Sequence, residues 1–161
     1  MTTKTVSTIL AITALIFGIS WYIKTYKMTP ALPSYEQALF NSQGVPVKVS
    51  DLKGKFVLIS YFQTWCADCI REIPSMEKLQ QSVRSQKLVI LLVSDESQNK
   101  LLRFKENHAG SLDVYSSALT LKEQGIHVFP TSYLLNENGQ VIMSQLQGFD
   151  WNSVEVRNLI K

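Results

Sequence analysis

Apolar residues follow two different patterns along the 161-residue chain. Residues 5–23 form one long stretch without a charged side chain. Later apolar residues come in short runs that alternate with segments of helical spacing. The continuous runs at residues 56–62 and 88–93 have the length and composition of strands covered on both faces. The pattern predicts an N-terminal apolar segment followed by an α/β domain.

Turn and capping residues divide the domain into further elements. Strands are predicted at residues 45–50, as an edge strand, at 113–115, and at 133–135 and 141–145, as a hairpin. Helices are predicted at residues 67–85, 97–107, 118–124 and 150–159. Pro74 is expected to kink the first helix, Gly125 to end the third and Asp150 to cap the last. This order indicates a mixed sheet with helices on both faces.

The uncharged stretch at residues 5–23 is long enough to cross a bilayer. Its nineteen residues, at about 1.5 Å each, give a helix of roughly 28 Å. Lys4 precedes it, and aromatic and basic residues typical of a membrane interface follow it up to Lys27. The alternative is a cleaved signal peptide, but the residues after the stretch are bulky and offer a poor cleavage site. We expect an uncleaved single-pass membrane anchor in contact with lipid.

Composition and charge indicate the domain organisation and exclude one class of partner. We expect the anchor at residues 1–27, a proline-containing linker at 28–34 and one domain at 35–161. The net charge is +3, and the lysines are scattered. No basic stripe results, so nucleic acid is not an expected partner.

Cys66 and Cys69, the only cysteines, lie at the junction between a predicted strand and a predicted helix. A helix N-terminus stabilises a thiolate, and a cysteine one turn later can close a disulfide with it. The pair therefore predicts a thiol–disulfide redox site. Structural zinc would need more ligands, and His108 and His127 have no ligand spacing. A purely structural disulfide remains an alternative, although so short a loop removes little unfolded-state entropy.

Several motifs together resemble the membrane-tethered thioredoxin-like proteins of the TlpA/ResA type. They are residues 53–58, Trp65 with the cysteine pair, Glu72 with Pro74, residues 129–131 and residues 138–140. The resemblance implies a thioredoxin fold over nearly everything after the linker. It also implies that Pro130 follows a cis peptide bond and lies against the disulfide; the residues alone indicate only that this X-Pro bond could be cis.

The cysteine pair and its neighbours suggest a division of labour. Cys66 is expected to be the more exposed and more acidic sulfur, and so the attacking thiolate. Cys69, one turn inside, is expected to be buried and to resolve the mixed disulfide. Glu72 is placed to accept the Cys69 proton, a role that the resemblance also assigns to it. The alternative for Glu72 is a solvated first-turn residue that complements the helix dipole.

Two further features bear on the reduction potential of the cysteine pair and on the recognition of a partner protein. Asp68 between the cysteines departs from the family pattern; its negative charge would disfavour the Cys66 thiolate and make the couple more reducing. An apolar rim where a partner protein docks is expected from Tyr61, Phe62, Trp65 and Phe129, with Thr131 beside it, although core packing could explain any of the aromatic residues. Ser60 stands where thioredoxins proper carry a buried aspartate on the central strand.

These features together predict a membrane-tethered thiol–disulfide oxidoreductase without a bound cofactor or metal. Positive charges on the two sides of the anchor are nearly balanced, so orientation rests on redox logic, which favours an oxidising compartment. The resemblance implies the bacterial cytoplasmic membrane, with the domain facing the periplasm or the cell exterior. It implies electrons from a membrane thiol-transporting reductase. It also implies disulfide substrates such as apocytochrome c, in cytochrome c maturation, or metal-site cysteines.

Two other functions compete with this one. An extracytoplasmic copper chaperone would use Cys66, Cys69 and His127, but copper-delivery relatives on this fold have a C-x-x-x-C spacing. A thiol peroxidase would need a peroxidatic cysteine in a Pro-x-x-x-Thr-x-x-Cys setting, which the sequence lacks.

Overall fold

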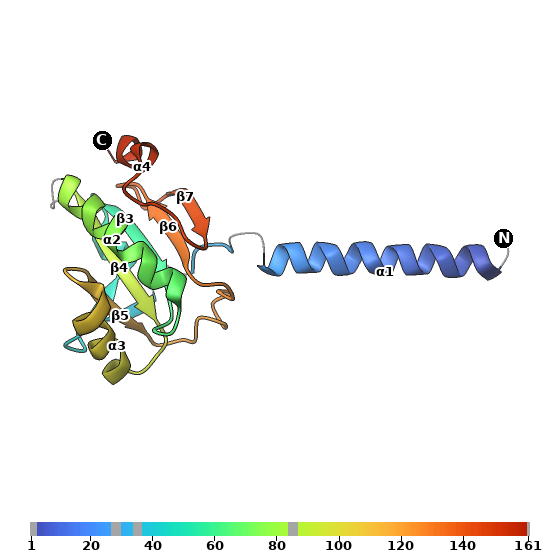
Figure 1. Ribbon diagram of the computed structural model, residues 1–161, viewed down its shortest axis with the longest axis horizontal. Coiled ribbons are helices and arrows are strands. Elements are labelled where there is room, and N and C mark those ends of the chain that lie inside the picture. Colours follow the sequence, from blue (N-terminus) through green and yellow to red (C-terminus); the bar gives the residue numbers. More distant parts are fainter. Residues whose placement is uncertain (1–2, 27–29, 34–36, 84–86, 161) are drawn as a thin grey trace.

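A seven-stranded mixed sheet organises the chain, in the order β2-β1-β5-β4-β3-β6-β7 (Figure 1). The computed structural model describes residues 3–26, 30–33, 37–83 and 87–160, without the side chains of 3–7 and 23–26. The strands are β1 (Ala38–Phe40), β2 (Pro46–Lys48), β3 (Phe56–Tyr61), β4 (Leu88–Ser94), β5 (Asp113–Ser117), β6 (Thr131–Leu135) and β7 (Val141–Leu146). The helices are α1 (Thr3–Tyr26), α2 (Ala67–Ser82), α3 (Gln98–Phe104) and α4 (Val154–Leu159), with a 3₁₀ turn η1 (Val49–Leu52) and a π turn η2 (Lys105–Ala109).

The centre of the sheet is the predicted strand β3. It pairs in parallel with β4 and antiparallel with β6. β4 also pairs in parallel with β5, and the predicted hairpin β6–β7 is antiparallel. Parallel crossovers followed by an antiparallel hairpin give the thioredoxin-like α/β fold that the sequence predicts. All six β3 residues are buried, because layers cover both faces of the sheet.

Alternation along β3 divides the core into two clusters. Leu58 and Phe62 belong to a cluster with the apolar side chains of α2, α3 and α4. Val57 and Ile59, which point to the opposite face, belong to a second cluster. That second cluster is completed by residues of η1, by Leu121 and Ile126, and by Leu32.

The prediction of helices on both faces is wrong for the α-helices. Because β3, β4 and β5 follow each other in one direction across the sheet, both crossover helices lie on one face, and α4 joins them (Figure 1). The helix expected at residues 118–124 on the other face is a series of turns. The segment does end at Gly125 as expected, with a φ of 80° that suits a glycine, and its Leu121 and Ile126 still fill the core.

Two smaller expectations also change. Asp150 does not cap the last helix: its side chain accepts the N–H of Asn152 within a turn, and Ser153 caps α4 instead. The sequence analysis missed β1, which has three residues and pairs with β2 and β5. The expected edge strand at residues 45–50 is confirmed in a shorter form, since β2 gives way to η1.

The N-terminal segment forms the 24-residue helix α1, which projects away from the sheet in Figure 1. Its described side chains, residues 8–22, are all exposed. Among the residues that the structure describes, no helix has the length and apolar character needed to cross a membrane. The anchor at residues 5–23 stays a prediction. After α1, the Pro30 carbonyl accepts the hydroxyl of Tyr133, so part of the expected linker is docked on the sheet.

Candidate redox site

The cysteine pair lies at the junction that the sequence predicts, between β3 and α2. Cys66 and Cys69 are joined by a disulfide, with their Cα atoms 5.3 Å apart. Cys66 is the N-cap residue of α2, and its Sγ accepts the Cys69 N–H at 3.2 Å. A sulfur in that position receives a helix N–H group and the positive end of the helix dipole. The geometry therefore favours a thiolate on Cys66 after reduction.

The expected difference in exposure between the two cysteines is absent from the oxidised form. Cys66 is 6% exposed and Cys69 is 5% exposed. Both pack in the cluster that α2 shares with β3. Cys66 must therefore be distinguished as the attacking sulfur by its place at the helix cap and not by its exposed area.

Glu72 is buried on the same helix, one turn after Cys69, with 3% of its surface exposed. Its Oε1 accepts the backbone N–H of Phe149 at 2.6 Å, and its Oε2 accepts the indole N–H of Trp151 at 3.3 Å. The alternative of a solvated first-turn residue is therefore wrong. Burial raises the pKa of Glu72 from 4.5 to about 7, and the two hydrogen bonds, which favour the charged form, offset part of that rise.

A carboxylate with this pKa can exchange a proton at neutral pH. Ser60, the counterpart of the thioredoxin aspartate, is a buried neutral group whose hydroxyl accepts that of Ser132 at 2.9 Å. Ser60 shares a face of β3 with Leu58 and Phe62, and so with α2. Among the described residues, Glu72 is the only buried carboxylate in this core. Proton transfer to or from Cys69 is the chemistry that it can supply.

The loop before β6 carries the expected cis peptide bond, between Phe129 and Pro130. Phe129 is half-buried and packs against both core clusters. Its ring meets that of Trp65 edge to face, with centroids 6.1 Å apart. Trp65 precedes Cys66 and is 71% exposed, whereas Pro130 is buried. An aromatic pair made of the exposed Trp65 and the half-buried Phe129 thus lies next to the cysteine pair, a surface that can receive an apolar partner segment.

The docking role expected for Thr131 is wrong for its side chain. Thr131 is fully buried, and its hydroxyl donates to the Val128 carbonyl at 2.6 Å. A partner cannot reach that hydroxyl, and it cannot reach the rings of Tyr61 and Phe62, which are buried in the core, so neither belongs to the rim. The hydrogen bond from Thr131 to Val128 instead stabilises the turn that contains Phe129 and Pro130.

Asp68 lies in the first turn of α2 and forms an ion pair with Arg71, one turn further on. Both side chains are substantially exposed, at 44% for Asp68 and 72% for Arg71. Water and Arg71 both weaken the field of the Asp68 carboxylate. Its effect on a Cys66 thiolate is therefore smaller than the sequence alone suggests.

The copper alternative requires Cys66, Cys69 and His127 to converge. His127 is exposed, and the two sulfurs are bonded to each other. Within the described ranges, no group of three His, Cys, Asp or Glu side chains is placed to hold a metal ion.

The sequence analysis missed Trp151 and Phe149, which hold the Glu72 carboxylate. Trp151 is completely buried, and its backbone N–H donates to Ser75 Oγ at 3.1 Å. The one signal available was a tryptophan in a polar C-terminal segment, because a buried indole N–H needs an acceptor. That signal does not name the acceptor 79 residues earlier in the chain.

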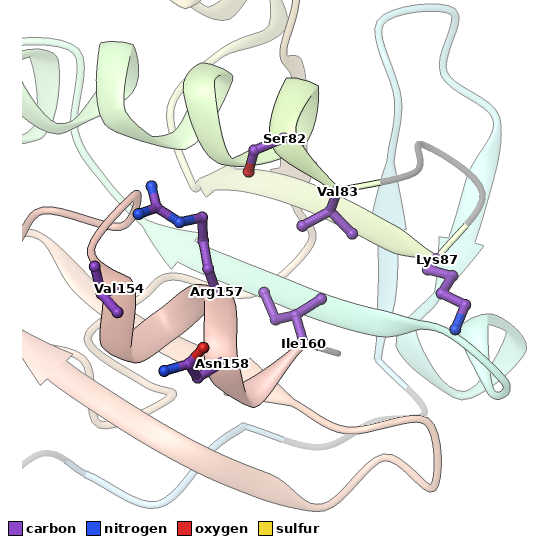
Figure 2. A pocket seen from close by; sticks show the side chains of 7 residues that line it. All are labelled: Ser82, Val83, Lys87, Val154, Arg157, Asn158 and Ile160. Carbon is purple, nitrogen blue, oxygen red and sulfur yellow. The ribbon is translucent and has the colours of Figure 1, made fainter.

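A separate cavity of about 530 Å³ lies between the end of α2 and α4 (Figure 2). Figure 2 shows Ser82 and Val83 on one side of it, and Arg157 and Ile160 on the other. Ser82 ends the 16-residue helix that Cys66 caps, so this cavity lies roughly 24 Å along α2 from the disulfide. It is not part of the redox site.

With this geometry established, comparison with known proteins gives the family. The sequence pattern of the AhpC/TSA family matches residues 29–145. The chain belongs to the AhpC/TSA family. Within that family it is a TlpA/ResA-like protein of the thioredoxin type. It is 27% identical over 154 residues to the thiol-disulfide oxidoreductase ResA of Halalkalibacterium halodurans, covering 91% of this chain and 88% of that protein.

Solved structures agree on the fold of this AhpC/TSA family member. StoA from Bacillus subtilis matches with a TM-score of 0.64 and 19% identity, covering 82% of this chain and 100% of that one. The thioredoxin domain of a thiol-disulfide oxidoreductase from Bacteroides vulgatus matches with a TM-score of 0.69 and 21% identity, covering 82% and 99%. The chain is a thiol–disulfide oxidoreductase of the thioredoxin-like class.

Proposed function

We propose that this oxidoreductase works as a reductase of disulfides in extracytoplasmic protein partners. The observation that carries the proposal is the buried Glu72 carboxylate, one turn after Cys69, with its pKa raised to about 7. A base beside the second cysteine serves the step in which a mixed disulfide is resolved. Cys66 at the helix cap serves the earlier step, in which a thiolate attacks.

The reaction proceeds in two exchanges. The Cys66 thiolate attacks one sulfur of the partner disulfide, forms an S–S bond with it and expels the other sulfur as a thiolate, which takes a proton. Glu72 then accepts the Cys69 proton, and the Cys69 thiolate attacks Cys66 Sγ. The second partner thiolate leaves and is protonated. The partner gains two electrons and two protons, and the enzyme is left with the disulfide Cys66–Cys69.

The aromatic pair supports a protein substrate over a small one. Trp65 and Phe129 offer apolar surface on the two loops that border the cysteines, and Pro130 lies between Phe129 and the buried Thr131. A partner segment laid across this rim would bring its disulfide to Cys66. By resemblance to the TlpA/ResA type, the partners would include apocytochrome c or oxidised metal-site cysteines.

We further propose that residues 1–27 anchor the enzyme through lipid contacts of residues 5–23, that 28–34 form the linker and that 35–161 form the catalytic domain. The domain would face the periplasm or the cell exterior from the bacterial cytoplasmic membrane. A membrane thiol-transporting reductase would return the pair to the dithiol form. The long uncharged N-terminal stretch and the ResA-like relatives support this arrangement.

The redox state of the enzyme in growing cells tests the proposal. Cells are quenched in acid, and free thiols are alkylated with a reagent that adds mass to each one. A reductase supplied with electrons is held mostly as the dithiol and gains two labels. A chain found mostly as the disulfide, including in cells grown without disulfide substrates, contradicts the proposal, because a reductase supplied with electrons is then held as the dithiol. A Cys69→Ser variant cannot resolve the mixed disulfide with Cys66, so the partner protein stays covalently attached to the enzyme and can be identified.

A further inference from the structure

Two consecutive carboxylates after β4, Asp95 and Glu96, contact the loop that leads to the cysteines. Glu96 accepts the Thr64 backbone N–H on Oε2 at 2.6 Å and the Thr64 hydroxyl on Oε1 at 3.0 Å. The Ser94 hydroxyl lies 3.4 Å from the same Oε2. The Glu96 side chain is only 9% exposed. Because one side chain accepts both the backbone N–H and the hydroxyl of Thr64, it fixes the position of that residue.

Asp95 joins the same loop to a distant segment. Its Oδ1 accepts the side-chain amide of Gln63 at 2.6 Å, and its Oδ2 accepts the backbone N–H of Leu121 at 2.7 Å. Gln63 belongs to the loop between β3 and α2, and Leu121 to the connection that runs on to Phe129. One carboxylate therefore links the two loops that present the aromatic pair.

The clamped residues form a tight turn. The Cys66 N–H donates to the Gln63 carbonyl at 3.0 Å, which closes residues 63–66. Gln63 is held through its side chain and Thr64 through its backbone, so Trp65 is left to project into solvent. The turn also sets where Cys66 meets the first turn of α2.

We propose that Asp95 and Glu96 are positioning residues for thiol–disulfide exchange. They fix the turn at residues 63–66 so that Cys66 Sγ stays at the N-terminus of α2 and Trp65 stays beside Phe129. They act through hydrogen-bond geometry and not through charge. This role holds for the oxidoreductase in either direction of electron flow, so it does not depend on the proposed reductase function.

Amide variants separate geometry from charge. In Glu96→Gln, the amide oxygen can still accept the Thr64 N–H, and the Thr64 hydroxyl can turn to accept the amide N–H₂. In Asp95→Asn, the new amide oxygen can accept the Leu121 N–H. The side-chain amide of Gln63 can then flip, so that its oxygen accepts the new amide N–H₂. Both variants keep the bonds to the two loops and lose the charge, and Glu96→Gln also loses the ion pair of Glu96 Oε1 with the exposed Lys100 Nζ at 3.3 Å, whereas alanine removes all of these.

The test uses the full-length chain in its dithiol form, as wild type, Glu96→Ala and Glu96→Gln, with Glu106→Ala as control. Glu106 is an exposed acid on η2. The readouts are kcat/KM for reduction of a protein disulfide and amide hydrogen exchange over residues 63–66. We expect Glu96→Ala to lose about tenfold or more in kcat/KM, because misplaced reacting groups cost that much, and to speed exchange. Glu96→Gln is expected to stay within about twofold of wild type, as is Glu106→Ala.

Two results would overturn the proposal. If Glu96→Ala keeps wild-type kcat/KM, the contact does not position the cysteines. If Glu96→Gln loses as much as Glu96→Ala, charge and not geometry is responsible. If Glu96→Ala does not fold, Thr64→Val tests the proposal instead. It removes only the hydrogen bond from the Thr64 hydroxyl to Glu96 and keeps the one from the Thr64 N–H. We expect Thr64→Val to show a smaller loss than tenfold but a measurable one, and no loss would overturn the proposal.

Discussion

Trp151 donates its indole N–H to Glu72 Oε2 at 3.3 Å, across 79 residues of sequence. The backbone N–H of Phe149 holds the other oxygen. The segment between β7 and α4 therefore closes over the carboxylate and separates it from water. That enclosure raises the pKa of Glu72 to about 7, so that it titrates near neutral pH.

The first prediction concerns stability against pH. The pKa of Glu72 in the folded protein, about 7, lies above its ordinary value of 4.5, so the folded state binds more protons between these two values. The Glu72 contribution is fully present below about pH 4.5 and is lost as pH rises through 7. The loss is at most about 3 kcal/mol in the free energy of unfolding. Urea unfolding of the oxidised protein at pH 5 and pH 8 measures it.

Glu72→Gln provides the comparison for that experiment. The variant cannot ionise, so the part of the pH dependence due to Glu72 disappears. Its NH₂ group takes the place of one of the two oxygens that accept the Phe149 and Trp151 N–H groups and cannot accept a hydrogen bond, so its stability at pH 5 falls by about 1–3 kcal/mol. If wild type and variant show the same change between pH 5 and pH 8, the carboxylate does not titrate in this range and the account of its pKa is wrong.

The second prediction concerns catalysis by the same residue. Without a base beside Cys69, resolution slows by about 10²–10⁴-fold, the usual contribution of general-base catalysis. The Glu72→Gln enzyme then accumulates the mixed disulfide through Cys66, which mass spectrometry of quenched reactions detects. Glu106→Gln, a change at an exposed acid, is the matched control and should resolve at the wild-type rate. Equal rates in Glu72→Gln and wild type would remove Glu72 from the mechanism.

The third prediction concerns Asp68 and Arg71. Removing the negative charge in Asp68→Asn favours the Cys66 thiolate and lowers its pKa, whereas Arg71→Ala unmasks that charge and raises it. Each shift stays under about one unit, because both side chains are exposed to water. The rate of alkylation of the reduced protein against pH gives both values. No fall in Asp68→Asn would show that Asp68 does not influence the thiolate.

The fourth prediction concerns the aromatic pair. Trp65→Ala removes the exposed ring that meets Phe129. Loss of such an anchor is expected to lower kcat/KM for a protein disulfide by about 10- to 30-fold, mainly through KM. Reduction of hydroxyethyl disulfide, which is too small to use the rim, should change little. Val154→Ala, at an exposed apolar residue elsewhere, controls for lost apolar surface, and an equal loss for both disulfides would refute a docking role.

Local patterns predicted most of the fold. The runs that became β3 and β4 lie in the middle of the sheet and carry their signal in consecutive residues. The helix expected at residues 118–124 failed because the segment begins only at Thr120, whose hydroxyl accepts the Glu123 N–H as a cap would, and Gly125 ends it one turn later. The strand β1 escaped notice because its three residues depend on pairing with β5, far along the chain.

The site was predictable where its residues lie close in sequence. The cysteine pair, the helix cap and the cis bond before Pro130 all follow from local motifs, the last through the resemblance. The burial of Glu72 did not, because it depends on Trp151 and Phe149. For the same reason, the sequence did not reveal the contacts of Asp95 and Glu96 with the cysteine loop, which cross between strands.

The reduction potential of the Cys66–Cys69 couple tests the central claim most directly. The full-length chain is equilibrated in thiol buffers of defined ratio, and its dithiol fraction is read by alkylation mass shift. We predict a potential at or below about −270 mV, the value for thioredoxin, as expected of a reductase. A potential near about −120 mV, the value for a strong oxidant such as DsbA, would contradict the claim and assign the enzyme to disulfide insertion.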